Sequence, residues 1–95
     1  MKTKWKDWWA GFGEITAKYE VKRDWAEEEE IRLNFKLQIY LDGNDYFFAR
    51  VMDWTGNEIV GLKKFGSLEE AIDYLSDVDC EKYVDEHREG LQKLI

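Results

Sequence analysis

The side chains best suited to catalysis in this chain are its single histidine, His87, and its single cysteine, Cys80. A histidine is the usual general base near neutral pH, but it activates a cysteine only within hydrogen-bonding reach. On one helix, positions 80 and 87 are separated along the axis by about 10 Å. The spacing argues against a Cys–His pair. We expect His87 at the edge of the core with one nitrogen hydrogen-bonded, and Cys80 buried as a small hydrophobic side chain.

Metal-binding and cofactor-binding patterns are incomplete in the sequence. Structural zinc takes four cysteine or histidine ligands, and the chain has one residue of each type. Acids at alternate positions from Asp77 to Glu81 have the spacing that opens a calcium loop. However, Lys82 occupies the glycine position of that loop and Arg88 its final glutamate. Phosphate-binding glycine loops and nucleophile elbows are absent. We therefore expect a non-enzymatic protein without metal or cofactor.

The most prominent candidate for binding is the acidic segment from Ser67 to Glu89, which contains nine acidic and two basic residues. Glu69, Asp73 and Asp77 recur every four residues, and such like-charged pairs cost a helix a few tenths of a kcal/mol each, about 0.2–0.5. Helical carboxylates at this density are spaced by roughly 4 Å, against about 3.4 Å for phosphates along one DNA strand. The predicted partner-binding residues are Glu69, Glu70, Asp73, Asp77, Glu81, Asp85 and Glu89.

The whole chain carries a net charge of -7, and residues 24–95 hold 18 acidic against 8 basic residues. In size and charge the chain resembles small acidic inhibitors encoded by bacteriophages, including anti-restriction and anti-CRISPR proteins. That resemblance implies a nucleic-acid mimic that occupies the basic groove of a DNA-binding or RNA-binding protein. The alternative is that the acidic helices are simply solvated, as in many cytoplasmic proteins.

A competing hypothesis comes from the N-terminal residues 2–9, which contain three lysines interleaved with three tryptophans. Indole rings stack on unpaired bases and lysines neutralise phosphates, so this segment could bind single-stranded nucleic acid. The residues involved would be Lys4, Trp5, Trp8 and Trp9, assisted on the predicted strands by Lys18, Lys22, Lys36 and Arg50. The tryptophans could instead close the open end of a sheet, or form a hot spot for a protein partner.

Length and composition limit the possible architectures. A chain of 95 residues supports one hydrophobic core, and its five tryptophans, five tyrosines and five phenylalanines can fill it. We therefore expect a single domain spanning residues 1–95. One cysteine excludes an intrachain disulfide and is typical of a reducing compartment. Without an apolar run of signal-peptide or membrane-spanning length, the predicted location is the cytoplasm.

Alternating apolar and polar residues predict the strands that must position these side chains. The alternation is clearest over residues 31–41, and it also predicts a strand at 12–22. Two further strands are expected at 46–54, which is apolar on both faces, and at 58–65. Residues 42–45 and 55–57 supply the turns between them. At residues 4–10, by contrast, the tryptophans are spaced i, i+3, i+4, which predicts a short helix.

Two helices are predicted after the strands. Ser67 and Glu70 form an S-x-x-E capping box, so the first helix should begin at Leu68. Asp79 is a good N-cap for the second helix, whose apolar stripe would consist of Cys80, Val84, His87, Leu91 and Leu94. The predicted fold is therefore α+β: a four-stranded antiparallel β-meander with a short N-terminal helix and two C-terminal helices packed on one face.

One stretch of the chain resembles known domain families. The strand at Tyr46–Val51, the hairpin, the strand at Ile59–Phe65 and the helix start at Gly66–Ala71 follow one another in a β-β-α order. This order is similar to plant-type and integrase-type DNA-binding domains built from three strands and a helix, and to HicB-like antitoxin domains. The strands retain only Arg50, Lys63 and Lys64 of the basic residues such DNA readers use, so no function is carried over from them.

Overall fold

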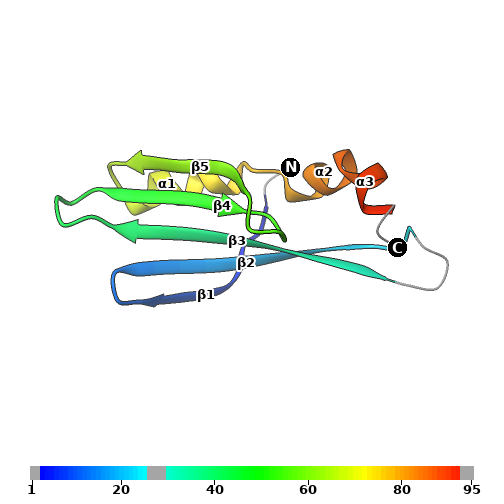
Figure 1. Ribbon diagram of the computed structural model, residues 1–95. Helices are drawn as coiled ribbons and strands as arrows, with labels where there is room; N and C mark the ends of the chain where they lie inside the picture. Colours follow the sequence, from blue (N-terminus) through cyan, green and yellow to red (C-terminus); the bar gives the residue numbers. More distant parts are fainter. Residues whose placement is uncertain (1–2, 26–29, 93–95) are drawn as a thin grey trace.

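The computed structural model describes residues 3–25 and 30–92 and contains a five-stranded antiparallel sheet with helices on one side of it (Figure 1). The strands lie in sequence order across the sheet, as a meander. The elements are β1 (Lys6–Gly11), β2 (Glu14–Arg23), β3 (Ile31–Leu41), β4 (Phe47–Met52), β5 (Glu58–Phe65), α1 (Leu68–Ser76), α2 (Cys80–Glu86) and α3 (Arg88–Gln92). The prediction of an α+β fold with an antiparallel sheet is confirmed, but the sheet has five strands rather than four.

The predicted N-terminal helix is wrong, because that segment forms the edge strand β1. The register of β1 against β2 shifts between Lys6 and Trp9, and Asp7 within the shift has a φ of 55°. Such a bulge inserts an extra residue into a strand and interrupts its two-residue period. The helix-like spacing of the tryptophans therefore belongs to a bulged strand. Trp5, which directly precedes β1, is buried, and its indole Nε1 donates to Leu75 O at 3.2 Å.

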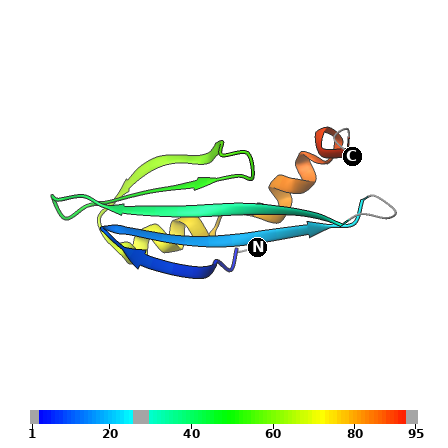
Figure 2. The same cartoon turned by 60° about the horizontal axis from the view of Figure 1, so that its bottom comes forward.

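The core lies between the sheet and the helices. Alternate residues of β2, β3 and β4 point toward the helices, and Phe35, Leu37 and Ile39 of β3 are almost fully buried. Leu75 of α1 and Val84 of α2 belong to the same buried cluster. The molecule is elongated, with principal extents of 50 × 21 × 21 Å, and Figure 2 shows the strands along its length with the helices beyond them.

Local signals set the helix starts as predicted. Glu70 N–H donates to Ser67 Oγ at 3.2 Å, although the Glu70 carboxylate accepts from Gly66 N–H at 3.3 Å and not from Ser67 as a strict capping box would. Asp79 caps α2 through Lys82 N–H at 3.0 Å. The second predicted helix is interrupted at His87, so its last turns form α3. Within the predicted stripe Leu91 is buried, His87 is exposed, and Leu94 lies outside the described residues.

The turn between β4 and β5 is organised by Asp53. Its Oδ1 accepts hydrogen bonds from Thr55 N–H, Thr55 Oγ1 and Asn57 N–H at 2.9, 2.6 and 3.1 Å, and its Oδ2 accepts from Tyr83 Oη at 2.9 Å. Burial alone would raise the pKa of this carboxyl, but these hydrogen bonds outweigh burial and hold the pKa below its ordinary value. One carboxylate thus joins a tight turn of the sheet to α2. Among the described helices, none has the length and apolar character needed to cross a membrane.

Candidate functional site

Charge is divided between the two sides of the sheet. Paired residues of antiparallel strands project to the same side, so the register defines the side facing away from the helices, which we call the open sheet face. It includes Lys6, Trp9, Glu14, Thr16, Lys18, Glu20, Lys22, Arg32, Asn34, Lys36, Gln38, Tyr40, Phe48, Arg50, Met52, Glu58 and Lys64. Seven of these residues are basic and three are acidic. The helical segment, with nine acids and two bases, has the opposite balance.

Three lysines form a row across the open sheet face. Lys6 on β1 is paired with Lys18 on β2, and Lys18 is paired with Lys36 on β3. Neighbouring strands lie about 4.8 Å apart, so the three side chains leave the sheet close together. None of them forms an ion pair with a described residue. Like charges placed directly opposite one another destabilise a sheet, and a bound anion would relieve that repulsion.

A polar hollow lies beside the lysine row. Its volume is about 330 Å³, at the lower end of the range of ligand sites, about 300–1,000 Å³. Its basic lining consists of Lys6, Lys18 and Lys22, and Asn34 adds an amide. Two acids, Asp7 and Glu20, also line it together with Tyr19, and Glu20 lies 3.7 Å from the Lys22 ammonium. Lys6 and Lys18 are thus the cations best placed to bind an anion there.

Aromatic rings accompany the lysines. Trp9 is 51% exposed and packs over Gly11, where an added Cβ would lie 3.0 Å from the indole. Gly11 therefore allows the indole to lie flat against the strand. Tyr40 on β3 is paired with Phe48 on β4, so two further rings stand side by side on this face, both half-buried. Flat, partly exposed rings next to lysines are the usual components of a single-strand nucleic-acid site.

A hydrogen-bonded network centred on Gln38 fixes one of these rings. Gln38 Oε1 accepts from Tyr40 Oη at 3.0 Å and from Arg50 Nε at 2.8 Å, while Gln38 Nε2 donates to Glu14 Oε1 at 3.0 Å. Arg50 also donates to Tyr40 Oη at 3.2 Å and to Glu58 Oε1 at 2.9 Å. The hydrogen bond to Glu58 raises the pKa of Arg50. Because Glu58 neutralises it, Arg50 serves to hold Tyr40 in place, and the row of Lys6, Lys18 and Lys36 supplies the uncompensated cations.

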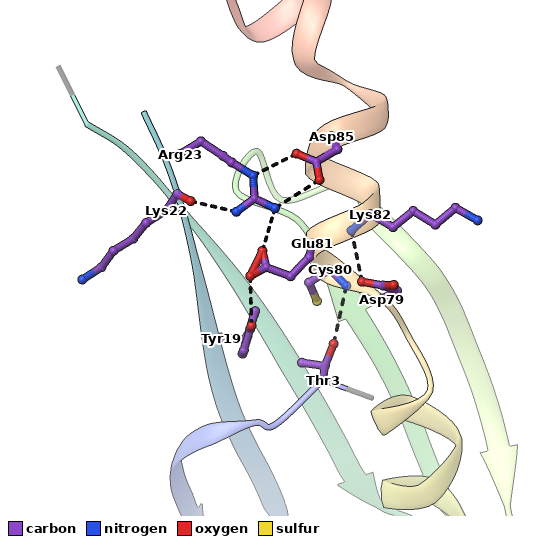
Figure 3. A network of polar contacts seen from close by, with 9 residues as sticks. All are labelled: Thr3, Tyr19, Lys22, Arg23, Asp79, Cys80, Glu81, Lys82 and Asp85. Carbon is purple, nitrogen blue, oxygen red and sulfur yellow. Dashed lines mark hydrogen bonds and ion pairs between the residues drawn. The ribbon is translucent and has the colours of Figure 1, made fainter. Parts of the chain in front are cut away.

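Two of the seven acids predicted to bind a partner are instead bound by Arg23, at the end of β2 (Figure 3). Arg23 Nε lies 2.8 Å from Asp85 Oδ1, and Arg23 Nη2 lies 2.9 Å from Glu81 Oε2. Glu81 Oε2 is buried, and this contact is an ion pair without the alignment of a hydrogen bond. Tyr19 Oη donates to the other Glu81 oxygen at 3.3 Å. Hydrogen bonding to Arg23 lowers the pKa of Asp85. These acids fasten α2 to the sheet.

The remaining predicted acids differ in their surroundings. Glu70 is occupied by the cap of α1. Glu69 and Asp73 are exposed on α1, and Glu89 is exposed on α3. Within the described part of the chain, no basic side chain forms an ion pair with these three. Asp77, at the end of α1, is also exposed. The acidic surface is therefore shorter than the sequence predicted.

The N-terminal residues of the competing hypothesis are not gathered into one site. Trp5 is buried under α1, and Trp8 is 46% exposed with its Nε1 donating to Trp5 O at 3.2 Å. Lys4 is exposed before β1, and Lys2 lies outside the described residues. Only Trp9 joins the lysines of the open sheet face. Sequence reasoning missed Tyr40, Phe48 and Gln38, although the polar half of the alternation over residues 31–41 already indicated a basic strand face.

Cys80 has the buried surroundings that the sequence predicted, but His87 does not. Cys80 is fully buried, and burial raises the pKa of its thiol to about 11, so it is protonated at neutral pH. His87 Nδ1 lies 2.8 Å from Tyr83 O and its ring is 4.3 Å from the Tyr83 ring, although the side chain is exposed and not at the core edge. In residues 3–25 and 30–92 no group of three or more acidic, histidine or cysteine side chains could hold a metal ion.

Comparison of the chain with models of protein families, with curated proteins and with solved structures gives no match. The geometry of the chain itself therefore carries the functional interpretation.

Proposed function

We propose that this chain is a non-enzymatic binding protein that holds single-stranded nucleic acid on its open sheet face. The observation that carries the proposal is the row of Lys6, Lys18 and Lys36 across three strands, without an acidic partner among the described residues. In a chain with a net charge of -7, three uncompensated cations side by side are not explained by stability or solubility. A polyanion lying across the strands would explain them.

In this proposal phosphates contact the lysine row while bases stack on the neighbouring rings. Trp9 on β1 and the pair of Tyr40 on β3 and Phe48 on β4 offer two stacking surfaces on the open sheet face. Stacking accepts every base, so we expect little sequence preference. The acidic helices on the other side of the sheet would repel the nucleic acid and orient the encounter toward the open sheet face. The cytoplasmic location expected from the single cysteine would give access to such ligands.

Trp9 provides a sharp test because the adjacent Trp8 is a matched control. The two tryptophans are 51% and 46% exposed, but only Trp9 is paired with a residue of the open sheet face. Replacing Trp9→Ala should weaken binding of a fluorescein-labelled oligothymidine of about 12 nucleotides by roughly 5- to 150-fold, which corresponds to about 1–3 kcal/mol for one stacked base. Fluorescence anisotropy measures this change directly.

The Trp8→Ala variant should bind the same oligonucleotide within about twofold of the unmodified chain. Equal losses in the two variants would indicate that neither indole stacks on a base, and the open sheet face would lose its role. Circular dichroism of both variants should show an unchanged fold, because both side chains lie outside the buried core cluster.

A second candidate function rests on the exposed acids of α1. We propose as the alternative that Glu69 and Asp73 bind a basic protein in place of nucleic acid, as an anti-CRISPR or anti-restriction inhibitor of phage type would. The observation in its favour is that both carboxylates are exposed to solvent without an ion pair to a described basic residue. Restriction endonucleases and CRISPR nucleases are the natural targets to assay.

If this second function holds, the chain should inhibit DNA cleavage by one such nuclease. The double variant Glu69→Gln and Asp73→Gln should then require about tenfold more protein for the same inhibition, as expected when about 1.4 kcal/mol of binding is lost. The matched control is Asp42→Asn with Asp45→Asn, which removes the same charge from the β3–β4 turn. No inhibition of any nuclease, or the same loss in both double variants, would contradict a specific acidic surface.

A further inference from the structure

An apolar hollow of about 180 Å³ opens at the end of the sheet where β1 joins β2. Its walls include Ile15, Ile39, Leu41 and Phe47, and Gly11 and Gly13 also line it. A cavity of about 150 Å³ lined by leucine, isoleucine and phenylalanine is large enough for a benzene ring. Leu41, on the wall, is 56% exposed, so the hollow is open to solvent.

Phe12, between these two glycines, is the most exposed large apolar side chain of the described residues. It occupies the β1–β2 turn with a φ of 52°, followed by Gly13 with a φ of 75°. Two consecutive left-handed residues define a type I′ turn, in which asparagine followed by glycine is preferred and a bulky side chain is strained. Phe12 therefore neither fills the core nor suits its turn.

Phe12 lies next to the apolar hollow, because the β1–β2 hairpin that carries it also supplies part of the lining. Phe12 does not enter its own hollow, because its side chain is fully exposed, yet its two neighbours in the chain line that hollow. A twofold axis passing between Phe12 and the hollow would place the Phe12 ring of each copy in the hollow of the other copy. Interfaces of this kind are self-complementary and close at two subunits.

From this arrangement we infer that the chain forms a twofold-symmetric dimer in which Phe12 of each copy fills the apolar hollow of its partner. The interface is apolar, whereas each copy carries a net charge of -7. Added salt screens the repulsion between the copies and should strengthen the dimer. Salt should weaken nucleic-acid binding. The opposite salt dependences allow the dimer and the proposed nucleic-acid site to be tested separately.

Sedimentation velocity over a range of protein concentrations tests the dimer. The unmodified chain should sediment as a dimer at the highest protein concentrations. Phe12→Asn should raise the dissociation constant of the dimer at least tenfold. Asparagine suits the type I′ turn, so at concentrations where both proteins are monomeric this variant should have a Tm equal to or higher than that of the unmodified chain. A chain that is monomeric up to about 1 mM would overturn the inference.

The hollow itself is tested by Leu41→Ser, with Leu62→Ser as the matched control. Both leucines are 56% exposed, but only Leu41 lines the hollow. We expect Leu41→Ser to weaken the dimer and Leu62→Ser to leave it unchanged. A dimer that survives both Phe12→Asn and Leu41→Ser would use another surface and would also refute the inference. Oligonucleotide affinity should be the same in all three variants.

Discussion

Replacing Lys18 and Lys36 together by glutamine should lower the affinity for a single-stranded oligonucleotide by about 100-fold. Each lysine is expected to make one charged contact to a phosphate, and a loss of about 1.4 kcal/mol per contact is a factor of ten. The same substitutions remove a like-charged cross-strand pair, so the free energy of unfolding should rise by about 0.2–1 kcal/mol. Weaker binding in a more stable protein is a combination that damage to the fold cannot produce.

The control for this experiment is the double variant Lys63→Gln with Lys82→Gln. It changes the net charge equally, but Lys63 lies over the ring of Tyr74 on α1 and Lys82 lies on α2, both away from the open sheet face. The slope of log affinity against log salt should fall by about 1.4 in the test variant, at about 0.7 per phosphate contact, and little in the control. Equal losses of affinity in both variants would show that the overall charge of the chain, and not the lysine row, determines binding.

The largest expected effect on stability comes from Phe35→Ala. Phe35 is fully buried in the centre of β3, and its ring meets Trp54 and Tyr83 edge-on at centroid distances of 5.6 and 5.9 Å. Truncating a buried phenylalanine typically costs about 3–5 kcal/mol, because burial is lost and a cavity remains. Urea denaturation followed by tryptophan fluorescence should show a large fall in the midpoint.

Phe48→Ala is the appropriate comparison for Phe35→Ala. Phe48 is half-buried and lies on the open sheet face, outside the core cluster. Its replacement should cost clearly less than that of Phe35, and it should weaken oligonucleotide binding, which Phe35→Ala should affect only through unfolding. A loss below about 1 kcal/mol for Phe35→Ala would show that the sheet and helices are not packed as described.

Much of the fold could be predicted because its signals are local. The alternation over residues 31–41 matches β3, and β5 has the predicted bounds of 58 and 65. The caps at Ser67 and Asp79 were readable because a capping side chain and the N–H it binds lie within three residues. Such patterns depend on neighbours in the chain and not on the rest of the structure.

The N-terminal strand could not be predicted, because the feature that defines it is not local in the sequence. A bulge at Asp7 adds one residue to β1, and its position depends on the pairing with β2, which no local pattern records. The length of the acidic surface was overestimated for a comparable reason. Arg23 reaches Asp85 across 62 positions of sequence, so neutralisation of this carboxylate becomes visible only when β2 and α2 are placed together.

The lysine row is also a product of register. Lys18 and Lys36 were identified as basic strand residues, but their alignment with Lys6 depends on three strands pairing at particular positions. Because side chains alternate, a slip of one residue would send Lys36 to the opposite side of the sheet. Its alignment with Lys18 would then be lost. The candidate site is therefore a property of the tertiary structure, and its aromatic part at Tyr40 and Phe48 depends on the pairing of β3 with β4.

The central claim is that the open sheet face, and not the acidic helices, contacts single-stranded nucleic acid. A titration of the ¹⁵N-labelled chain with oligothymidine, followed by amide chemical shifts, tests it most directly. The predicted result is a set of shifts that centres on Trp9, Lys18 and Lys36 and leaves Asp73 and Glu86 unmoved. Shifts confined to α1 and α2, or no shifts at a ligand excess, would contradict it.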